Sequence, residues 1–534
     1  MNISYKRIAV SYFLVIVLLF VCAFRIFAVM NEERYKEAAE QISRRVVALD
    51  FSRGSIFDAN MNKITNATEM YYAVIFDEAR GASVLYSNFT SEEIDRILND
   101  INQNGFSVRR VDREIKADGI YCVKGYTHAN DGLMAKHLVG YVNSEGKGVC
   151  GLEASFDDLL YCDDKNQIVF TIDGQGNIID GYSPEVSFNY GKQNSGIQIT
   201  IDKNIQQIAE QKAMQINCGA VVITEIETGK IRAMVSRPDY RLSDLSSAIS
   251  SESEPLLNRA LCTYNIGSVF KPLVAAVGYE TARKMEVNCT GYTNVDGLSF
   301  ACHRLGGHGP VDLSSALKFS CNTFFYNYIQ QISTDRLFEM AKKAGFDSTV
   351  YLSSGLASAK GNLGETDSGK LTKRSLANIS IGQGELMVSP LAITNLYMAI
   401  ARDGSYIPPH LIEGEVEDLK LINKSTPPKS IKLFSKATAD KLKTDLSAVL
   451  EEGGTGKTAR PKLVSAAGKT GTAQTGVVKG GKKVTNSWFC GFFPLDNPKY
   501  AVTVLSENAK GGCGGVFAEI ADAITVYEQK NRQH

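Results

Sequence analysis

The sequence predicts an α+β protein with a mostly antiparallel sheet flanked by helices, preceded by an elongated α+β module and one N-terminal transmembrane helix. Three observations predict this fold class. A long apolar run opens the chain, and short β-rich runs mixed with turn-rich polar pieces follow it. The C-terminal part then shows two strand-like runs, a helical stretch, three more strand-like runs and a final helical pattern. That order is typical of one sheet covered by helices.

The apolar run occupies residues 8–29. A helix of this length crosses a hydrocarbon core of about 30 Å at about 1.5 Å per residue. Basic residues precede the run and acidic residues follow it, so we expect residues 1–7 to be a cytoplasmic tail and the bulk of the chain to lie outside the cell membrane. A cleaved signal peptide is the alternative, but no small-x-small cleavage site follows the run.

The overall composition excludes one class of partner. Lys plus Arg and Asp plus Glu are 58 each, so no overall field attracts nucleic acid and no such partner is expected. The 11 cysteines would suggest disulfides in an exported chain, but their number is odd and their spacing irregular.

Residues 31–190 form the predicted α+β module. They contain no pair of carboxylates and no metal pattern that stands out, so we expect a pedestal or dimerisation-type module that serves as a spacer or interaction platform. A polar, glycine-containing stretch at residues 189–196 marks the boundary. Residues 196–534 are then the second domain.

The second domain opens with two β-rich runs in residues 218–236, separated by Glu-Thr-Gly-Lys, which predict a hairpin. Helix-like segments dominate from about residue 265 to about residue 450. Three further strands and a closing amphipathic helix are predicted over residues 463–474, 487–494, 500–507 and 517–529.

Ser268 and Lys271 form the first candidate catalytic pair. The run after Gly267 is helix-like, so these residues lie at i and i+3 on one helical face, where the amine can approach the hydroxyl. In a dry pocket near the positive end of a helix, a lysine has a lowered pKa and can act as a base. The pattern alone is common, and its alternative is a helix N-cap followed by a surface lysine.

The second candidate element is Ser320-Cys321-Asn322. Residues i and i+2 do not share a helix face, so both ends reach one substrate only if the tripeptide lies in a turn between helices.

The third candidate element is Lys469-Thr470-Gly471-Thr472, which precedes strand-like residues. On an edge strand it would offer a cation and a hydroxyl to a carboxylate, and a glycine where a ligand backbone comes close. The alternative is an ordinary turn before a strand.

The three motifs, in this order and context, resemble the penicillin-binding protein transpeptidases, which belong with the β-lactamases to one family of serine acyl-transferases. The resemblance covers roughly residues 196–530. Residues 53–60 and 148–153 look like the N-terminal module of class B members. No glycosyltransferase-type domain fits in the length that precedes the motifs, which points away from class A.

The resemblance implies a peptidoglycan D,D-transpeptidase with a penicillin-binding fold that needs no cofactor for its acyl chemistry. Ser268 would attack the penultimate D-alanine carbonyl of a stem peptide, and Lys271 would take its proton. Ser320 would relay protons to the leaving D-alanine, and Asn322 would hold the peptide amide.

The carboxylate end of the substrate is assigned by the same resemblance. Lys469, Thr470 and Thr472 would bind the terminal carboxylate beside Gly471. The backbone N–H groups of Ser268 and Thr472 would form the oxyanion hole. Penicillin and other β-lactams, which mimic the terminal dipeptide, should acylate the serine and stay.

Cys321 has another set of possible partners. In the family the middle residue of the second motif varies and is not a nucleophile. Thiol, imidazole and carboxylate groups nearby predict a structural zinc site, with the ligands Asp296, Cys302, His308 and Cys321. His303 or Cys289 is a less favoured fourth ligand than Asp296. A disulfide between Cys302 and Cys321, or no relation among these residues, is the alternative.

Other functions remain open for the same motifs. A D,D-carboxypeptidase or a β-lactamase would use the same site, and a mainly scaffolding wall-synthesis subunit would use the membrane helix and the module that follows it. The resemblance also implies a partner, a multi-span glycan polymerase of the SEDS type, together with other wall-synthesis proteins. The sequence does not choose among cell division, elongation that sets cell shape, and sporulation.

Overall fold

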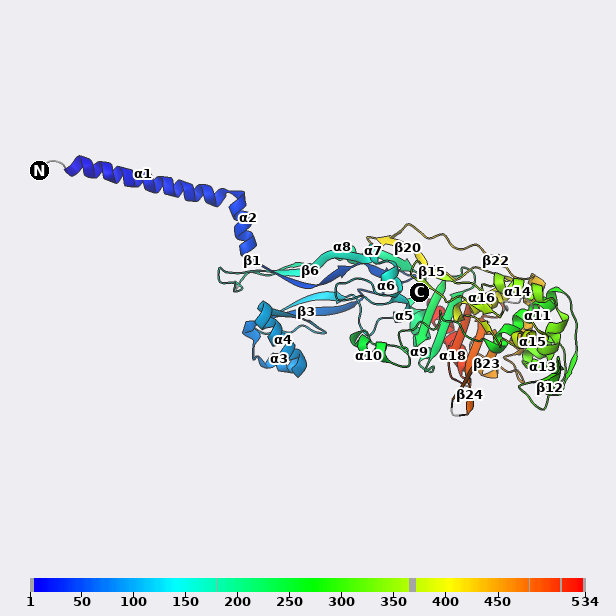
Figure 1. Cartoon of the computed structure of the whole chain (residues 1–534). Helices are drawn as coiled ribbons and strands as arrows, with labels where there is room; N and C mark the ends of the chain where they lie inside the picture. Colours follow the sequence, from blue (N-terminus) through cyan, green and yellow to red (C-terminus); the bar gives the residue numbers. More distant parts are fainter. Residues whose placement is uncertain (1–3, 180, 365–370, 480, 510, 532–534) are drawn as a thin grey trace. The chain divides into compact units, whose positions relative to one another are not determined.

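The computed structural model describes residues 4–179, 181–364, 371–479, 481–509 and 511–531 (Figure 1). They form two compact units. The first unit is assembled from Met1–Ser52, Glu69–Gly125 and Cys162–Tyr190. The second is assembled from Arg53–Thr68, Tyr126–Tyr161 and Gly191–His534.

The chain enters the second unit earlier than the sequence suggested. We expected one boundary near residue 190, but Arg53–Thr68 and Tyr126–Tyr161 also belong to the second unit. A long-range strand pairing explains part of this difference, because β2 (Ser55–Phe57) pairs in parallel with β8 (Gly196–Ile199). Local sequence patterns carry no information about a partner so far along the chain.

Helix α1 (Ser4–Asn31) is long and apolar enough to cross a membrane, judged by length and composition. Its described side chains are exposed along its length. An apolar helix with no protein covering it requires an apolar solvent, and this fits a single-pass membrane anchor.

The centre of the first unit is a three-stranded sheet of order β4-β3-β5. Alternate side chains of β3 (Thr68–Phe76) enter two different hydrophobic clusters, so both faces of this strand are buried. Helix α4 (Ser91–Asn104) contributes to one cluster, and a capping box between Thr90 and Glu93 closes its N-terminus. The other elements of this unit are α2 (Glu33–Ile42), β1 (Arg44–Arg53), η1 (Asp77–Ala79), α3 (Ser83–Asn88), β4 (Phe106–Val111), β5 (Ile120–Thr127), β6 (Tyr161–Thr171) and β7 (Glu185–Ser187).

The second unit is built on a five-stranded sheet of order β10-β9-β25-β24-β23 whose neighbours are all antiparallel. The predicted hairpin and the three predicted later strands are confirmed. They are β9 (Gly219–Glu225), β10 (Ile231–Arg237), β23 (Ala467–Lys479), β24 (Lys482–Phe493) and β25 (Tyr500–Ser506).

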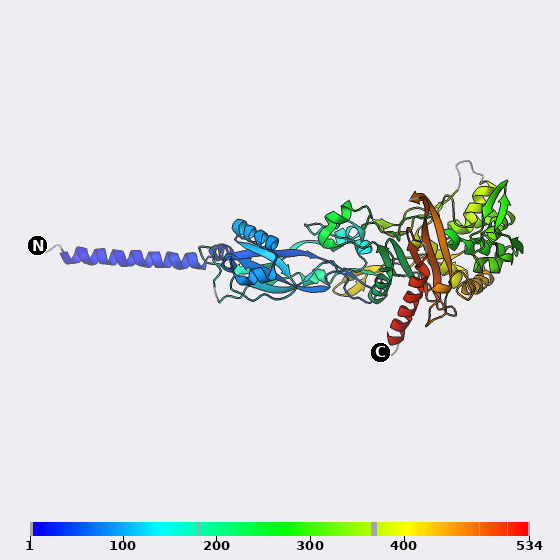
Figure 2. The ribbon, with the colours of Figure 1, turned by 90° about the horizontal axis from the view of Figure 1, so that it is seen from below.

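Helices cover both faces of this sheet. On one face lies α18 (Cys513–Asn531), the red helix in Figure 2, and its Phe517 ring packs 4.5 Å from that of Phe489 on β24. On the other face α16 (Pro390–Ala401) is buried at every residue, and Thr394 Oγ1 lies 2.9 Å from Thr503 Oγ1 of β25. The predicted fold, a sheet flanked by helices, is therefore confirmed.

The remaining elements of the second unit are short and lie mostly between β10 and β23 in the chain. Before β10 they are α5 (Lys136–Val139), α6 (Gly151–Ser155), α7 (Asp157–Leu160), α8 (Tyr190–Gln193) and α9 (Lys203–Ala213). After β10 the helices are η2 (Leu242–Asp244), α10 (Leu245–Ser250), η3 (Gly267–Phe270), α11 (Lys271–Glu280), α12 (Leu313–Lys318), α13 (Asn322–Tyr328), η4 (Ile329–Gln331), α14 (Thr334–Lys343), α15 (Lys373–Ser380), α17 (Lys436–Ala448) and η5 (Lys457–Ala459). The strands there are β11 (Val287–Cys289), β12 (Tyr292–Val295), β13 (Leu298–Ala301), β14 (Gly309–Val311), β15 (Tyr351–Ser353), β16 (Leu356–Ala357), β17 (Asn362–Leu363), β18 (Leu386–Met387), β19 (Ser405–Tyr406), β20 (Ile412–Glu417), β21 (Lys420–Ile422) and β22 (Ile431–Lys432).

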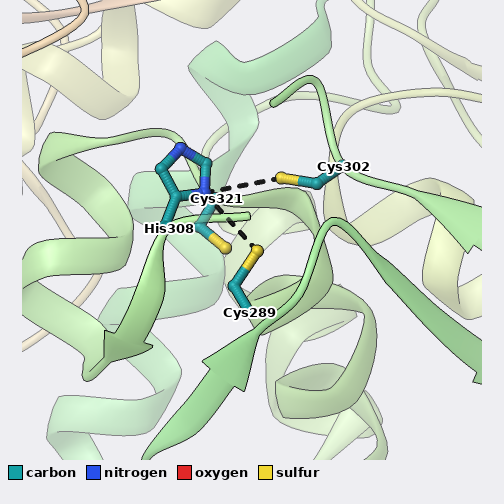
Figure 3. Close-up of side chains that lie close together, drawn as sticks. All are labelled: Cys289, Cys302, His308 and Cys321. Atoms are coloured by element: carbon teal, nitrogen blue, oxygen red, sulfur yellow. Dashed lines mark hydrogen bonds between the residues drawn. The ribbon is translucent and has the colours of Figure 1, made fainter. Parts of the chain in front are cut away.

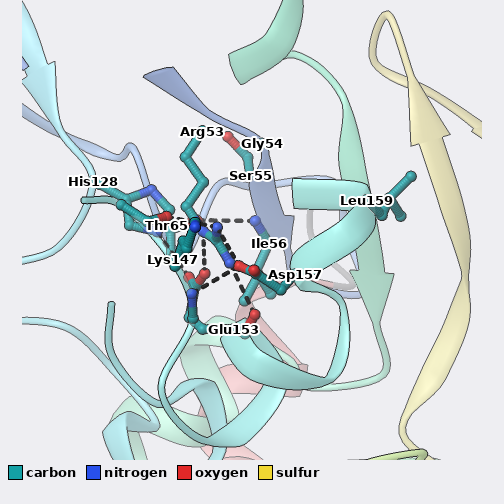
Figure 4. Close-up of polar contacts among 12 residues, drawn as sticks. Arg53, Gly54, Ser55, Ile56, Thr65, His128, Lys147, Glu153, Asp157 and Leu159 are labelled. Carbon is teal, nitrogen blue, oxygen red and sulfur yellow. Dashed lines mark hydrogen bonds and ion pairs between the residues drawn. The ribbon is translucent and has the colours of Figure 1, made fainter. Parts of the chain in front are cut away.

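A buried polar network joins the first two segments of the second unit (Figure 4). Arg53 donates from Nε to Glu153 Oε2 at 2.6 Å and from Nη1 to Asp157 Oδ1 at 2.7 Å. The His128 ring lies between Glu153, at 2.8 Å, and Asn66, at 3.1 Å. Burial opposes ionisation of Glu153, but His128 and Arg53 outweigh it and lower the pKa of this carboxyl group.

Removing the carboxylate at the centre of this network should destabilise the second unit. Glu153→Ala leaves Arg53 buried with one charged partner fewer, and we expect the free energy of unfolding to fall by about 3 kcal/mol. Trp488 is the single tryptophan of the chain and is buried in the second unit, so its fluorescence during urea unfolding reports on this unit.

Glu452→Ala is the matched control, because it removes an exposed carboxylate that pairs with Lys457 in the same unit. Its urea midpoint should equal that of the unchanged protein. Equal midpoints for Glu153→Ala and Glu452→Ala would show that the network contributes nothing to stability.

Candidate active site

Ser268 lies in the 3-10 turn η3, which leads directly into α11 and its first residue Lys271. Pro272 occupies the first turn of α11, where a missing N–H costs nothing. Ser268 is half-buried, and among the residues that the structure describes its hydroxyl has no hydrogen-bond partner. The hydroxyl is therefore free to meet a ligand.

Close backbone packing positions this turn. The Gly267 N–H donates to the Gly382 carbonyl at 2.8 Å. Both glycines have positive φ, 62° and 72°. A Cβ on Gly267 would lie 2.7 Å from Thr472 O, and one on Gly382 would lie 2.0 Å from Gly267 O. The serine turn thus packs directly on the backbone of β23, and larger residues would push it away.

Two aromatic side chains hold the flanks of the same turn. Trp488 Nε1 donates to Asn265 O at 3.1 Å, and the Tyr397 hydroxyl donates to Val269 O at 3.0 Å. Sequence reasoning missed both residues. Each sits in an apolar stretch, and nothing in such a stretch says which carbonyl its polar atom will reach.

The Lys271 amine is fully buried and joins the first two motifs. Its Nζ lies 2.7 Å from Ser320 O, 2.7 Å from Asn322 Oδ1 and 3.2 Å from Ser320 Oγ. Burial lowers the pKa of Lys271 to about 7. A neutral amine has two N–H donors for the two carbonyl oxygens and keeps a lone pair to accept a hydroxyl proton.

The predicted turn between helices is confirmed for the second motif. Ser320 and Cys321 connect α12 to α13, and Ser320 has a φ of 53°. This left-handed conformation is strained for a residue with a Cβ. It lets Ser320 and Asn322 both reach Lys271. Cys321 is fully buried, and its Sγ lies 3.2 Å from Thr323 Oγ1.

Strand β23 carries the third motif at the edge of the sheet. Lys469 is fully buried, and burial together with the neighbouring Lys271 lowers its pKa well below the usual value. Within the described part of the chain no carboxylate lies within ion-pair distance of it. Thr470 Oγ1 donates to Thr455 Oγ1 at 3.1 Å, and Thr472 is exposed. Burial without a counter-ion disfavours the charged form of this amine, and an anionic ligand beside it would restore the charge.

Gly471 has a packing role that we did not expect. We predicted that it makes room for a ligand backbone, and that prediction stays open. A Cβ there would lie 2.9 Å from Ile266 O and 3.0 Å from Trp488 Cβ. The glycine is required because the serine turn packs on this side of the strand.

Gln383 is a further residue of this site that sequence reasoning left without a role. Its Oε1 accepts from the Gln474 N–H of β23 at 3.2 Å. Its Nε2 is buried and has no partner among the described residues. The side chain therefore bonds to the exposed edge of β23 two residues after Thr472.

The thiol and imidazole cluster is confirmed as a spatial group (Figure 3). Its members are Cys289, Cys302, His308 and Cys321, whose ligand atoms all lie within 4.8 Å of one another. His308 Nδ1 lies 3.5 Å from Cys289 Sγ and 3.7 Å from Cys302 Sγ. The three cysteines are buried and His308 is half-buried. A hydrogen bond from Cys321 lowers the pKa of Cys302, which favours a thiolate there.

The fourth member of the cluster is Cys289 and not Asp296. Asp296 and Gly297 form the two-residue turn between β12 and β13, both with positive φ. Asp296 is exposed there and pairs with Arg374 at 3.4 Å. The Asp-Gly pair between two strand-like runs is a strong hairpin signal, and it could have excluded Asp296 from the sequence alone. His303 is exposed, with Nδ1 3.9 Å from Cys302 Sγ.

Comparison with protein families matches residues 219–525 to the model described as the penicillin binding protein transpeptidase domain. This range contains all three motifs and the whole five-stranded sheet.

Two curated relatives illustrate the match. Stage V sporulation protein D of Bacillus subtilis is 26% identical over 532 residues, which cover 90% of this chain and 78% of that protein. Peptidoglycan D,D-transpeptidase PbpA of Mycolicibacterium smegmatis is 31% identical over 360 residues, which cover 62% of this chain and 71% of that protein.

Solved structures show the same fold. The PBP2 of Helicobacter pylori in its complex with MreC aligns with a TM-score of 0.65 at 20% identity, covering 91% of this chain and 99% of that one. The PBP3 of Mycobacterium tuberculosis complexed with aztreonam aligns with a TM-score of 0.64 at 22% identity, covering 91% of this chain and 97% of that one.

Proposed function

The chain belongs to the penicillin-binding protein transpeptidase family, and from this premise we propose that it is a class B, membrane-anchored D,D-transpeptidase. It joins peptidoglycan stem peptides through an acyl-enzyme on Ser268. One observation carries the proposal: the Lys271 amine is buried, is held by Ser320 and Asn322, and lies one helical turn from a serine with a free hydroxyl. Relatives named peptidoglycan D,D-transpeptidases support the substrate class.

The acylation step follows from the positions of these groups. Ser268 Oγ attacks the penultimate D-alanine carbonyl, and its proton passes to the neutral Lys271 amine. The N–H groups of Ser268 and Thr472 stabilise the oxyanion. The proton then moves through Ser320 to the nitrogen of the departing D-alanine. The amine of a second stem peptide attacks the acyl carbonyl and forms the crosslinking amide. The ester bond to Ser268 breaks, and a proton from that amine returns to Ser268 Oγ.

The substrate is held by the other two motifs. Asn322 binds the peptide amide, and Lys469, Thr470 and Thr472 bind the terminal carboxylate. The absence of a carboxylate partner for Lys469 among the described residues supports this assignment, because the substrate would supply it.

The setting of the enzyme is inferred from α1 and its flanks. Basic residues precede the apolar helix, so the catalytic unit lies outside the cytoplasm. β-Lactams acylate Ser268, as the aztreonam complex of the Mycobacterium tuberculosis PBP3 suggests. A glycan polymerase of the SEDS type is the partner proposed for the membrane helix and the first unit. The Helicobacter pylori PBP2 is bound to another protein, MreC.

We also infer that the cluster of Cys289, Cys302, His308 and Cys321 holds a structural zinc. The donor set fits, because three thiols and one imidazole are common tetrahedral zinc ligands, and tetrahedral sulfur ligands lie about 3.8 Å apart. The separations within the cluster are compatible with such a site. The ion would fix Cys321, and with it the strained neighbour Ser320, without taking part in acyl transfer. A disulfide of Cys321 with Cys302 is the competing state.

The proposed mechanism makes a prediction about the pair of Ser268 and Lys271. Only the neutral amine accepts a proton, so the rate constant for acylation by fluorescent penicillin should rise about tenfold per pH unit up to pH 7 and level off above it. Ser268→Ala should abolish labelling. Ser315→Ala is the control and should still be labelled. Ser315 and Lys318 form a second Ser-x-x-Lys pattern, in α12, to which we assign no catalytic role. Labelling of Ser268→Ala would contradict the assigned nucleophile.

Product analysis, the lifetime of the penicillin adduct and the growth of cells with Ser268→Ala separate the rival functions. With a stem-peptide substrate and an acceptor amine, a transpeptidase forms the crosslinked product, whereas a carboxypeptidase releases only the hydrolysed peptide. A β-lactamase loses its penicillin adduct within seconds. If cells that carry Ser268→Ala in place of the unchanged protein grow normally, scaffolding is the main role.

The zinc assignment makes a prediction about metal content. The purified protein should contain about one zinc per chain by elemental analysis, and Cys289→Ser should lose it. Penicillin labelling of Cys289→Ser should be slower because Ser320 is released. Cys218→Ser, a half-buried cysteine outside the cluster, should keep both properties. A metal-free preparation with normal labelling, or an oxidised pair of Cys302 and Cys321 in the active protein, would overturn the zinc assignment.

A further inference from the structure

A cavity lies at the edge of the five-stranded sheet opposite to β23. It has a volume of about 360 Å³ and is walled by α5, α9 and the edge strand β10. All three elements belong to the second unit, and no lining residue comes from the three catalytic motifs. A cavity of this size is large enough for a small organic ligand.

Most charged groups that line the cavity already have partners. The Asp131 carboxylate accepts from the Ser243 N–H at 2.9 Å and pairs with Arg241 at 3.1 Å. Lys136 donates to Tyr240 O at 2.8 Å and pairs with Asp239 at 2.9 Å. These side chains form the wall of the cavity and have little capacity left for a ligand.

The single imidazole of the wall is also engaged. His137 Nε2 donates to the Pro255 carbonyl at 2.7 Å. Burial lowers the pKa of His137, so this ring is neutral and carries no charge toward the cavity.

Two groups of opposite charge remain. Glu210 uses one oxygen, Oε1, to accept from Ala135 N at 2.8 Å and from Gln206 Nε2 at 2.9 Å. Its second oxygen has no hydrogen-bond partner among the described residues. Arg237 has a buried Nε without a partner, and in the described part of the chain its guanidinium has no carboxylate within 4.0 Å.

Glu210 and Arg237 therefore line one cavity without pairing with each other. Each of these partly buried charges loses hydration, and because the two groups do not form an ion pair, no direct attraction between them offsets that loss. A molecule that carries both charges would satisfy the two groups at once. Met134 and Met234 also line the cavity and offer thioether surface to the apolar part of such a molecule.

We propose that this cavity binds a small zwitterion of the amino acid or dipeptide class, with its carboxylate on Arg237 and its ammonium on Glu210. Arginine binds a carboxylate in a fork geometry. An ammonium beside Glu210 offsets the burial that otherwise raises the pKa of this carboxyl group. The ligand is distinct from the substrate held at Ser268, because the two sites lie at opposite edges of the sheet.

The test uses the full chain in detergent, first acylated with benzylpenicillin so that the Ser268 site is occupied. D-Alanine and D-alanyl-D-alanine are the two probes, titrated by saturation-transfer NMR, and they distinguish an amino acid from a dipeptide. We expect saturable binding of at least one. N-Acetylation removes the ammonium of the probe, and C-terminal amidation removes its carboxylate. Each change should weaken binding of that probe by roughly tenfold or more.

The protein variants test the same contacts from the other side. Arg237→Gln and Glu210→Gln should each weaken binding of the zwitterion by roughly tenfold. Arg336→Gln, which changes an exposed residue of α14, should leave the affinity unchanged. The N-acetylated probe should be insensitive to Glu210→Gln. Normal penicillin labelling shows that a variant is folded. Absence of binding up to about 10 mM, or blocked probes that bind the unchanged protein as well as the zwitterion, would overturn the proposal.

Discussion

The buried amine of Lys271 is the contact on which the geometry of the site depends. Among the hydrogen bonds described, it is the only group that connects helix α11 to both ends of the Ser320-Cys321-Asn322 turn. Because burial removes its hydration, these three polar contacts take the place of water. The same burial lowers the pKa of Lys271 to about 7. The loss of hydration thus fixes the architecture of the site and lowers the pKa of the amine that we propose as the base.

The strained Ser320 is held from two directions. Lys271 binds its carbonyl on one side, and on the other the adjacent Cys321 is buried in the thiol and imidazole cluster. A left-handed φ at a residue with a Cβ costs roughly 1–3 kcal/mol, so it persists only where its surroundings enforce it. The cluster therefore bears on the active site through backbone conformation.

Sequence patterns predicted the parts of this site that depend on local periodicity. The i, i+3 spacing of Ser268 and Lys271 predicted that the two residues share one helical face. Residues at i and i+2 do not share a helix face, and this predicted the turn that contains Ser320. The prediction of Asp296 as a metal ligand was wrong. It rested on the presence of a carboxylate near the cysteines and ignored the Asp-Gly pair, which is a hairpin signal and places Asp296 in a turn. Trp488 escaped detection because its role depends on a carbonyl that folding brings near it.

The position of β23 at the edge of the sheet explains why glycines lie where the serine turn packs on this strand. In an antiparallel sheet the central strands are saturated with hydrogen bonds, and only the edges can take a new partner. At one edge, Gly267 and Gly471 let the serine turn approach β23 closely enough to place the proposed nucleophile beside its exposed backbone. At the other edge, Gln206 bonds to the N–H and C=O of Met234 and blocks the strand with a side chain. One edge is thus closed to strand addition, and the other is left open for a peptide substrate.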